Sequence, residues 1–149
     1  MFFSPYIVIQ SRLSVSGINN LNGDINGVVS TYPSNNTAET MGDKWIVTLS
    51  ELNNQESFTL KNQKTGQYLY VNAHGEAKSS KDVILTNMFS WKVFPVDNNQ
   101  HFYFRNLENK RILDCNDFVD CVDSTTKRCS IAHAYRNYTG SDYQKWDIL

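Results

Sequence analysis

The chain has 149 residues, a common size for a single domain with its own core. Apolar residues make up 40% of it and charged residues 19%, which is typical of a globular protein and too apolar for a disordered chain. The net charge of −1 comes from mixed signs along the sequence, whereas a nucleic-acid partner needs a concentrated basic surface, so no such partner is expected.

The N-terminal stretch MFFSPYIVIQ is apolar, but no apolar run approaches the ~20 residues of a membrane-spanning helix. The stretch also lacks the basic start and the small-residue cleavage site of a signal peptide. We therefore expect no membrane insertion. The protein is expected to be cytoplasmic, secreted by a non-classical route, or the mature form of a secreted subunit.

Short strand-like segments follow one another along the whole chain. They are rich in β-branched and aromatic residues, often alternate with a period of two, and are separated by turn sequences such as KTG and AHG. In chain order they are YIVI, GVVSTY, WIVTL, SFTL, QYLYV, WKVF, HFYF, RILDC, SIAHAY and KWDIL. No longer segment has a helical period, so we predict an all-β fold.

An internal repeat organises these strands. Residues 58–72 (FTLKNQKTGQYLYVN) align without a gap on residues 102–116 (FYFRNLENKRILDCN), a shift of 44 residues. The N-terminal IVIQSRLSVS fits the same pattern if its first hairpin is about five residues shorter. Each unit closes with a tryptophan strand, and Trp45, Trp91 and Trp146 lie 46 and 55 residues apart. This spacing indicates radial repetition.

Three units of four short strands are too few for a propeller but fit a β-trefoil, a pseudo-three-fold closed barrel capped by three hairpins. We predict a single β-trefoil domain over residues 1–149, with repeats at approximately 1–52, 53–97 and 98–149. A β-sandwich with chance repeats is the alternative. The expected core comprises Ile7, Ile9, Leu13, Trp45, Phe58, Leu60, Leu69, Trp91, Phe102, Phe104, Leu113 and Trp146.

The third repeat carries a more specific pattern: RILDCND, then SIAHAY, then YQKW. This pattern resembles one subdomain of the ricin-B-type (R-type) lectin trefoils, in which an apolar-apolar-Asp step precedes an alternating strand and a final Q-x-W. The likeness of three repeats covers the whole chain, but the first repeat ends in DKW and the second in FSW, without the glutamine. Other β-trefoil families share the barrel pattern, among them protease inhibitors and haemagglutinin subunits of toxin assemblies.

The resemblance implies a carbohydrate site in the third repeat. Asp114 matches the family's sugar-binding aspartate, whose carboxylate accepts hydrogen bonds from neighbouring hydroxyls. Gln144 matches the glutamine that braces the aspartate loop. Tyr135 is the candidate for an aromatic platform under the sugar ring, with His133 as the alternative. Two asparagines are further hydrogen-bonding candidates: Asn116 and Asn137.

The repeat alignment places Tyr70 at the position of Asp114 in the second repeat and Ser14 in the first. Neither offers a two-oxygen acceptor, so we expect one competent site. The resemblance implies galactose or N-acetylgalactosamine glycans and glycoproteins as partners. A single shallow sugar site has a dissociation constant on the order of millimolar, so avidity would require a homodimer, a larger complex or a second binding surface.

Several alternatives remain open at this stage. Asp114 can instead cap its own loop through backbone N–H groups. The series Asp114, Asp117, Asp120 and Asp123 lacks the spacing of a calcium loop. The cysteines, with His133, lack the close pair of a zinc site. We therefore predict no metal and no cofactor.

The three cysteines allow at most one intrachain disulfide, and we expect mostly buried free thiols: Cys115, Cys121 and Cys129. No thiol is marked as activated and no catalytic motif occurs, so an enzyme is not expected. We interpret the N-x-[S/T] matches at Asn35 and Asn137 as coincidences in an Asn-rich chain, because no signal peptide is recognised. If the protein is secreted, a glycan on Asn137 would crowd the sugar site.

The alternative function is a protein-interaction module. It would be a protease inhibitor that uses the long segments SGINNLNGDING or CNDFVDCVDSTTKRC, or a haemagglutinin or targeting subunit of a toxin assembly.

Overall fold

The computed structural model describes residues 6–11, 19–33, 41–50, 56–82, 87–116, 118–121 and 124–149. Strands dominate it, together with two short 3-10 helices, which confirms the predicted all-β class. In chain order the elements are β1 (Ile7–Ser11), β2 (Asn19–Asp24), β3 (Val29–Pro33), β4 (Met41–Gly42), β5 (Lys44–Ser50), β6 (Ser57–Asn62), β7 (Tyr68–Val71), β8 (Ala77–Ser80), η2 (Asn87–Phe89), β9 (Trp91–Val96), β10 (His101–Asn106), β11 (Ile112–Asp114), β12 (Phe118–Cys121), β13 (Ser124–Ile131), β14 (His133–Tyr135), η3 (Asp142–Gln144) and β15 (Trp146–Ile148).

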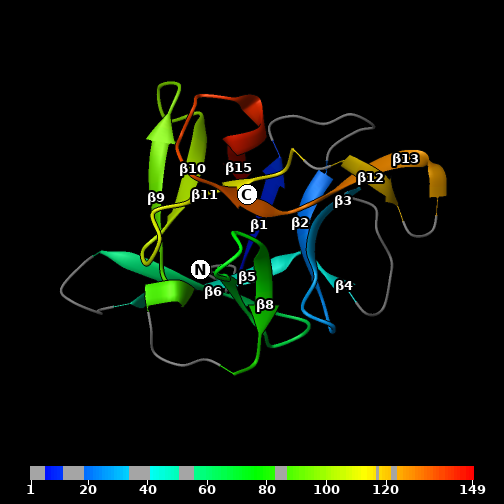
Figure 1. Cartoon of the computed structure of the whole chain (residues 1–149), viewed down its shortest axis with the longest axis horizontal. Coiled ribbons are helices and arrows are strands. Elements are labelled where there is room, and N and C mark those ends of the chain that lie inside the picture. The colour runs from blue at the N-terminus through cyan, green and yellow to red at the C-terminus, as the bar shows by residue number, and fades with distance from the viewer. Residues whose placement is uncertain are drawn as a thin grey trace, which may run out of the picture.

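Six of these strands form a closed antiparallel barrel. β1 pairs with β5 and β15, β6 pairs with β5 and β9, and β10 pairs with β9 and β15. Figure 1 shows β9, β10 and β15 side by side in this barrel. Each repeat contributes its first and its last strand, and every barrel strand has a neighbour on both sides, so the barrel has no exposed edge.

Three hairpins cover one end of the barrel: β2–β3, β7–β8 and β11–β14. Backbone hydrogen bonds of 2.8–3.0 Å join each hairpin to the next: Ser79 N to Gly27 O, Ala134 N to Gly75 O, and Ala132 N to Val29 O. Gly27 has a φ of 82°, and a β-carbon on it would lie 2.6 Å from Ser79 O, so this contact requires glycine. The closed barrel with its three-fold cap is the predicted β-trefoil.

Each repeat ties its hairpin to the barrel through the tryptophan of its closing strand. The three indole rings are 0% exposed. Their N–H groups donate to hairpin carbonyls at 2.9, 3.1 and 3.3 Å, respectively Trp45 to Leu21, Trp91 to Leu69 and Trp146 to Leu113. A buried indole N–H without an acceptor is costly, so these bonds hold the hairpin strands in equivalent places.

The barrel pairs confirm the gap-free alignment of the second and third repeats. Phe58 pairs with Trp91, and Phe102 pairs with Trp146 in the same way.

The alignment of the first repeat was wrong. Leu21 accepts the indole hydrogen bond there, so the residue equivalent to Asp114 is the next one, Asn22. Ser14, the predicted equivalent, lies outside the described residues. The physical reason is chain length: residues 12–18 connect β1 to β2, whereas only residues 63–67 connect β6 to β7, so the first connection is longer rather than shorter.

Most of the predicted core is confirmed. Eight of its members are at most 1% exposed: Ile9, Trp45, Leu60, Leu69, Trp91, Phe104, Leu113 and Trp146. Ile7, Phe58 and Phe102 are partly buried, and Leu13 lies outside the described residues. Leu21, which the repeat alignment left out, is a fully buried core residue.

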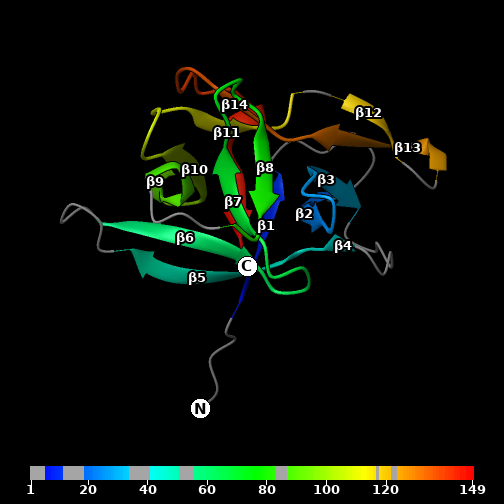
Figure 2. The same cartoon turned by 60° about the horizontal axis from the view of Figure 1, so that its bottom comes forward.

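The third repeat departs from the other two by an inserted hairpin, β12–β13, which projects from one side of the molecule (Figure 2). Its strand β13 pairs with β3, while β14 pairs with β11. The predicted strand SIAHAY is therefore two strands, divided at Ala132. Within the described part of the chain, no helix reaches the length and apolarity needed to cross a bilayer.

The cysteines differ from the expectation in part. Cys115 is a buried free thiol, and burial raises its pKa to about 11, which keeps it protonated and unreactive. Cys129, however, is disulfide-bonded, so the prediction of free thiols is wrong for this residue. Sequence spacing carries no information on which thiols meet in space. A disulfide sulfur also offers no thiolate to zinc.

Asn62, the last residue of β6, provides the first test of the fold. It is 0% exposed, its Nδ2 donates to Gly42 O at 2.8 Å, and its Oδ1 accepts from the backbone N–H groups of Lys64 and Thr65 at 3.1 Å. Asn62→Ala leaves these groups without their partner. We expect the free energy of unfolding, measured by urea denaturation, to fall by about 3 kcal/mol.

The control is Asn26→Ala, which changes an exposed asparagine in the β2–β3 turn and should shift stability by no more than about 0.5 kcal/mol. Equal effects of the two substitutions would contradict the role assigned to Asn62.

Candidate functional site

A pocket of about 270 Å³ opens beside the hairpin of the third repeat. Eight residues line it: Asp114, Asn116, His133, Tyr135, Thr139, Ser141, Tyr143 and Gln144. They come from the end of β11, from β14, and from the segment that leads through η3 into β15. Strand pairing places Asp114 opposite His133, and the Cys115 N–H donates to Tyr143 O at 3.1 Å, which brings the η3 segment to the same place.

Asp114 lines the pocket with a largely buried side chain, which is 7% exposed. Its Oδ1 accepts the backbone N–H of Asn116 at 2.7 Å and lies 3.3 Å from Nε2 of His133. The bond from Asn116 is the one expected if Asp114 only caps its own loop. The same carboxylate also faces the pocket, so the cap by itself does not account for the residue.

The charge of Asp114 is costly to the fold. Burial raises its pKa above the ordinary value of 3.8, and the lowering effects of the Asn116 N–H, the His133 charge and a hydrogen bond with Gln144 do not cancel the rise. Capping alone does not require that charge. In the second repeat the neutral Oδ1 of Asn72 caps a turn by accepting two backbone N–H groups at 3.0 Å.

Gln144 braces the chain segment that leads into η3. Its side chain is buried, with Nε2 donating to Asn137 O at 3.0 Å and Oε1 accepting from Thr139 N at 2.8 Å. The backbone of residues 137–139 is thus fixed against η3. The helix itself begins at a capping residue, Ser141, whose Oγ accepts from Tyr143 N at 3.2 Å.

Aromatic and hydroxyl side chains also line the pocket. Tyr135 is 50% exposed at the end of β14, and Tyr143 is partly buried. Thr139 and Ser141 add hydroxyl groups. A carboxylate and an exposed aromatic ring in one pocket fit a ligand that has both hydroxyl groups and an apolar face.

The second repeat does not reproduce this site. Tyr70 occupies the position of Asp114, and Phe89 occupies that of Gln144, two residues before the tryptophan. The two rings pack against each other with centroids 5.0 Å apart. An aromatic pair therefore replaces the pair of carboxylate and amide.

The first repeat differs in another way. Asn22 takes the aspartate position, and its Nδ2 donates to the backbone carbonyl of Asn20 at 3.0 Å. Asp43 takes the glutamine position and accepts from Asn20 Nδ2 at 2.8 Å. In the first repeat the acidic side chain thus occupies the glutamine position, not the aspartate position, and it is bonded to β2.

Five of the six predicted site residues line one pocket: Asp114, Asn116, His133, Tyr135 and Gln144. Asn137 does not line it and contributes only its carbonyl, to Gln144. Asn116 is exposed, and its backbone N–H binds Asp114.

The sequence reasoning missed three lining residues: Thr139, Ser141 and Tyr143. Their signal was the turn TGSDY before the tryptophan strand, which indicates a cap but not a pocket wall. Of the four aspartates whose spacing does not match a calcium loop, Asp114 is the one whose side chain the structure describes. Among the described residues no three acidic, histidine or cysteine side chains gather at a metal-binding distance.

No family model matches the sequence, and no curated protein matches it. The structure is similar to the crystal structure of a designed three-fold symmetric protein, ThreeFoil, with a TM-score of 0.69 over 98% of this chain and 99% of that chain. The two sequences are 16% identical, so the likeness shows the fold alone. The chain thus has the β-trefoil fold, while its membership of the R-type lectin family stays a prediction.

Proposed function

We propose that the protein is a lectin with one carbohydrate site in its third repeat, directed to galactose or N-acetylgalactosamine on glycans or glycoproteins. The observation that carries the proposal is the carboxylate of Asp114, which lines an open pocket although burial opposes its ionisation. A charge of this kind has a use if a ligand completes its hydrogen bonds.

A pyranose matches the pocket in chemistry. Its hydroxyl groups donate to the Asp114 carboxylate, and charge-assisted bonds of this type are short and directional. Its C–H face packs against the exposed ring of Tyr135. A sugar with an axial 4-hydroxyl, such as galactose, presents a continuous C–H face on one side, which supports the galactose-type ligands that the resemblance implies.

Binding without turnover fits the same lining. Glycoside hydrolysis uses a pair of carboxyl groups on either side of the scissile bond. Of the eight residues that line this pocket, Asp114 is the one carboxylic acid. We therefore propose a binding protein rather than an enzyme, and propose that useful avidity comes from a homodimer or a larger complex.

The protein-interaction alternative loses one of its two candidate loops. Residues 19–24 of SGINNLNGDING form strand β2, most of which is buried. The other segment forms the β12–β13 hairpin, whose second strand is paired with β3. A protease-inhibition assay that showed tight inhibition, with no sugar bound on a glycan array, would favour this alternative.

Asp114→Asn separates binding from folding. The amide keeps the shape and an oxygen for the Asn116 N–H but cannot accept as a carboxylate does. We expect binding to galactose-type glycans, measured on an array and by calorimetry, to be lost. Because the buried charge is removed, thermal stability should stay the same or rise.

The matched control is Asp24→Asn, the same change at a turn of the first repeat, where Oδ1 caps the N–H groups of Asn26 and Val28. It should leave glycan binding intact. If Asp114→Asn binds sugar normally, the proposed site is wrong.

Tyr135→Ala tests the platform. The ring is half exposed, so stability should change little, while the loss of packing on the sugar should weaken binding about tenfold. Tyr135→Phe keeps the ring and should bind nearly as well as the wild type in the same calorimetric titration. A Phe variant as weak as the Ala variant would show that the hydroxyl, not the ring face, matters.

The raised pKa of Asp114 gives two pH dependences. Sugar binding uses the ionised form, so affinity should fall as the pH decreases through a value above 3.8, the ordinary pKa. The stability of the wild type relative to Asp114→Asn should instead fall as the pH rises. Below the unfolded-state pKa both proteins are neutral at this position, and the penalty appears as the pH rises through the folded-state pKa.

Calorimetry across the acid range measures the first dependence, and urea unfolding of both proteins measures the second. A wild type that gains stability over the variant as the pH rises would mean that the charge is stabilising, and the central observation of the proposal would fail.

A further inference from the structure

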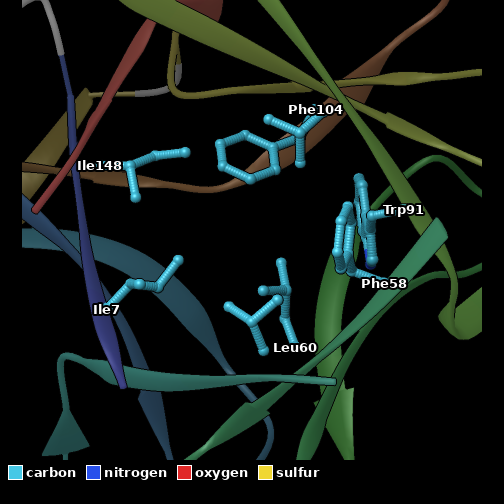
Figure 3. A pocket seen from close by; sticks show the side chains of 8 residues that line it. Ile7, Phe58, Leu60, Trp91, Phe104 and Ile148 are labelled. Atoms are coloured by element: carbon cyan, nitrogen blue, oxygen red, sulfur yellow. The ribbon is translucent and has the colours of Figure 1, made fainter. Parts of the chain in front are cut away.

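The barrel holds a second pocket, of about 310 Å³, lined by apolar side chains from all six barrel strands. The lining residues are Ile7, Val47, Phe58, Leu60, Trp91, Val93, Phe104 and Ile148. In Figure 3 the labelled side chains surround a common central space. Among the described residues that line the pocket, the one polar group is the Trp91 indole, whose N–H is already bonded to Leu69 O.

This pocket lies at the end of the barrel away from the hairpins. The tryptophans donate to hairpin carbonyls, and Val47, Val93 and Ile148 each follow two residues later on the three closing strands. Trp91 and two further side chains at most 1% exposed, Leu60 and Phe104, belong to its deep part. It is therefore separate from the pocket of Asp114, which lies beside a hairpin.

The size of the equivalent side chains explains part of the space. Two residues after its tryptophan the third repeat has Ile148. The first two repeats have valine there, which is one methylene smaller. Protein interiors are usually packed without voids larger than a water molecule, so a space of this size is a departure from ordinary packing.

Water is a poor occupant for this space. A buried water needs two to four polar partners, and an apolar cavity of roughly 150 Å³ in another protein stays dry and binds benzene. The barrel pocket has about twice that volume and a lining without free polar groups. It also falls at the lower end of the roughly 300–1,000 Å³ range of ligand pockets.

Exposed aliphatic side chains also occur on the strands at this end of the barrel. Val47 is 38% exposed, and Leu49, two residues further along β5, is 57% exposed. Leu149 is 65% exposed, and its backbone pairs with Val8 at the same end of the barrel. Exposed aliphatic groups of this kind next to a pocket favour a ligand that is apolar along its length rather than only at its tip.

We propose that this end of the barrel binds a medium-length aliphatic chain, such as that of a fatty alcohol or fatty acid, with the polar head group at the mouth in water. Transfer of each methylene from water into the pocket strengthens binding, and the gain ends when the space is full.

A chain-length series tests this directly. Calorimetric titration of the wild type with 1-hexanol, 1-octanol and 1-decanol should show affinity rising about fourfold for each added methylene until the pocket is filled. Asp114→Asn should give the same series, because the two pockets are separate. Failure of this experiment therefore leaves the sugar proposal untouched.

Val47→Phe should fill the space and weaken 1-octanol binding about tenfold or more. The matched control is Val28→Phe, the same change at a valine of similar exposure, 40% against 38%, in the β2–β3 hairpin at the other end. The control should bind 1-octanol like the wild type.

If Val47→Phe does not fold, methyl NMR of the wild type decides the question. 1-Octanol should shift the methyl signals of Val93 and Ile148 and leave those of Val28 in place. Absence of binding, or shifts at Val28 without shifts at Val93, would overturn the proposal. So would size-exclusion data showing that the alcohol only dissociates a dimer, because the pocket would then be an interface between copies.

Discussion

The hydrogen bond from each buried tryptophan to a leucine carbonyl is the interaction on which the rest of this β-trefoil depends. Each indole is fully buried in the complete fold, and its N–H would have no acceptor if the hairpin carbonyl were displaced, at a substantial cost. The three bonds therefore draw β2, β7 and β11 onto the end of the barrel in equivalent positions. In each repeat the residue after the bonded leucine is held in an equivalent place, whatever its chemistry.

That position has become different in each repeat. It holds Asn22, Tyr70 or Asp114, each with a partner that suits it: a backbone carbonyl, an aromatic ring, or a histidine and a backbone N–H. Asn22 and Tyr70 make these contacts within the protein and need no ligand for them. The third keeps a carboxylate where burial opposes its charge, which supports the proposed role of Asp114 in binding a ligand. The insertion after β11 adds to the difference. Asp24 and Asn72 close tight turns, whereas the equivalent Asn116 lines the pocket.

The two pockets show how one rigid barrel offers two environments. At the hairpin end, backbone and side-chain polar groups converge because strands end there and the connecting segments must satisfy their N–H and C=O groups. At the other end, alternation turns only apolar side chains inward, so that space has no hydrogen-bonding capacity left to offer. A hydroxylated ligand and an aliphatic one would thus be separated by the layer of tryptophans between them.

Local pattern was enough to predict the fold, because a period-two alternation, a shift of 44 residues and three spaced tryptophans each leave few arrangements open. It was also enough to select Asp114 and Gln144, since both stand at set distances from a tryptophan strand. Local pattern could not predict contacts between segments that are distant in the sequence. The disulfide of Cys129, the place of Tyr143 in the pocket wall and the register of the first repeat all depend on how connections cross in space. The pKa of Asp114 and the hollow in the barrel are tertiary as well: alternation states which side chains face inward, but only packing decides how well they fill the volume and how far a charge is removed from water.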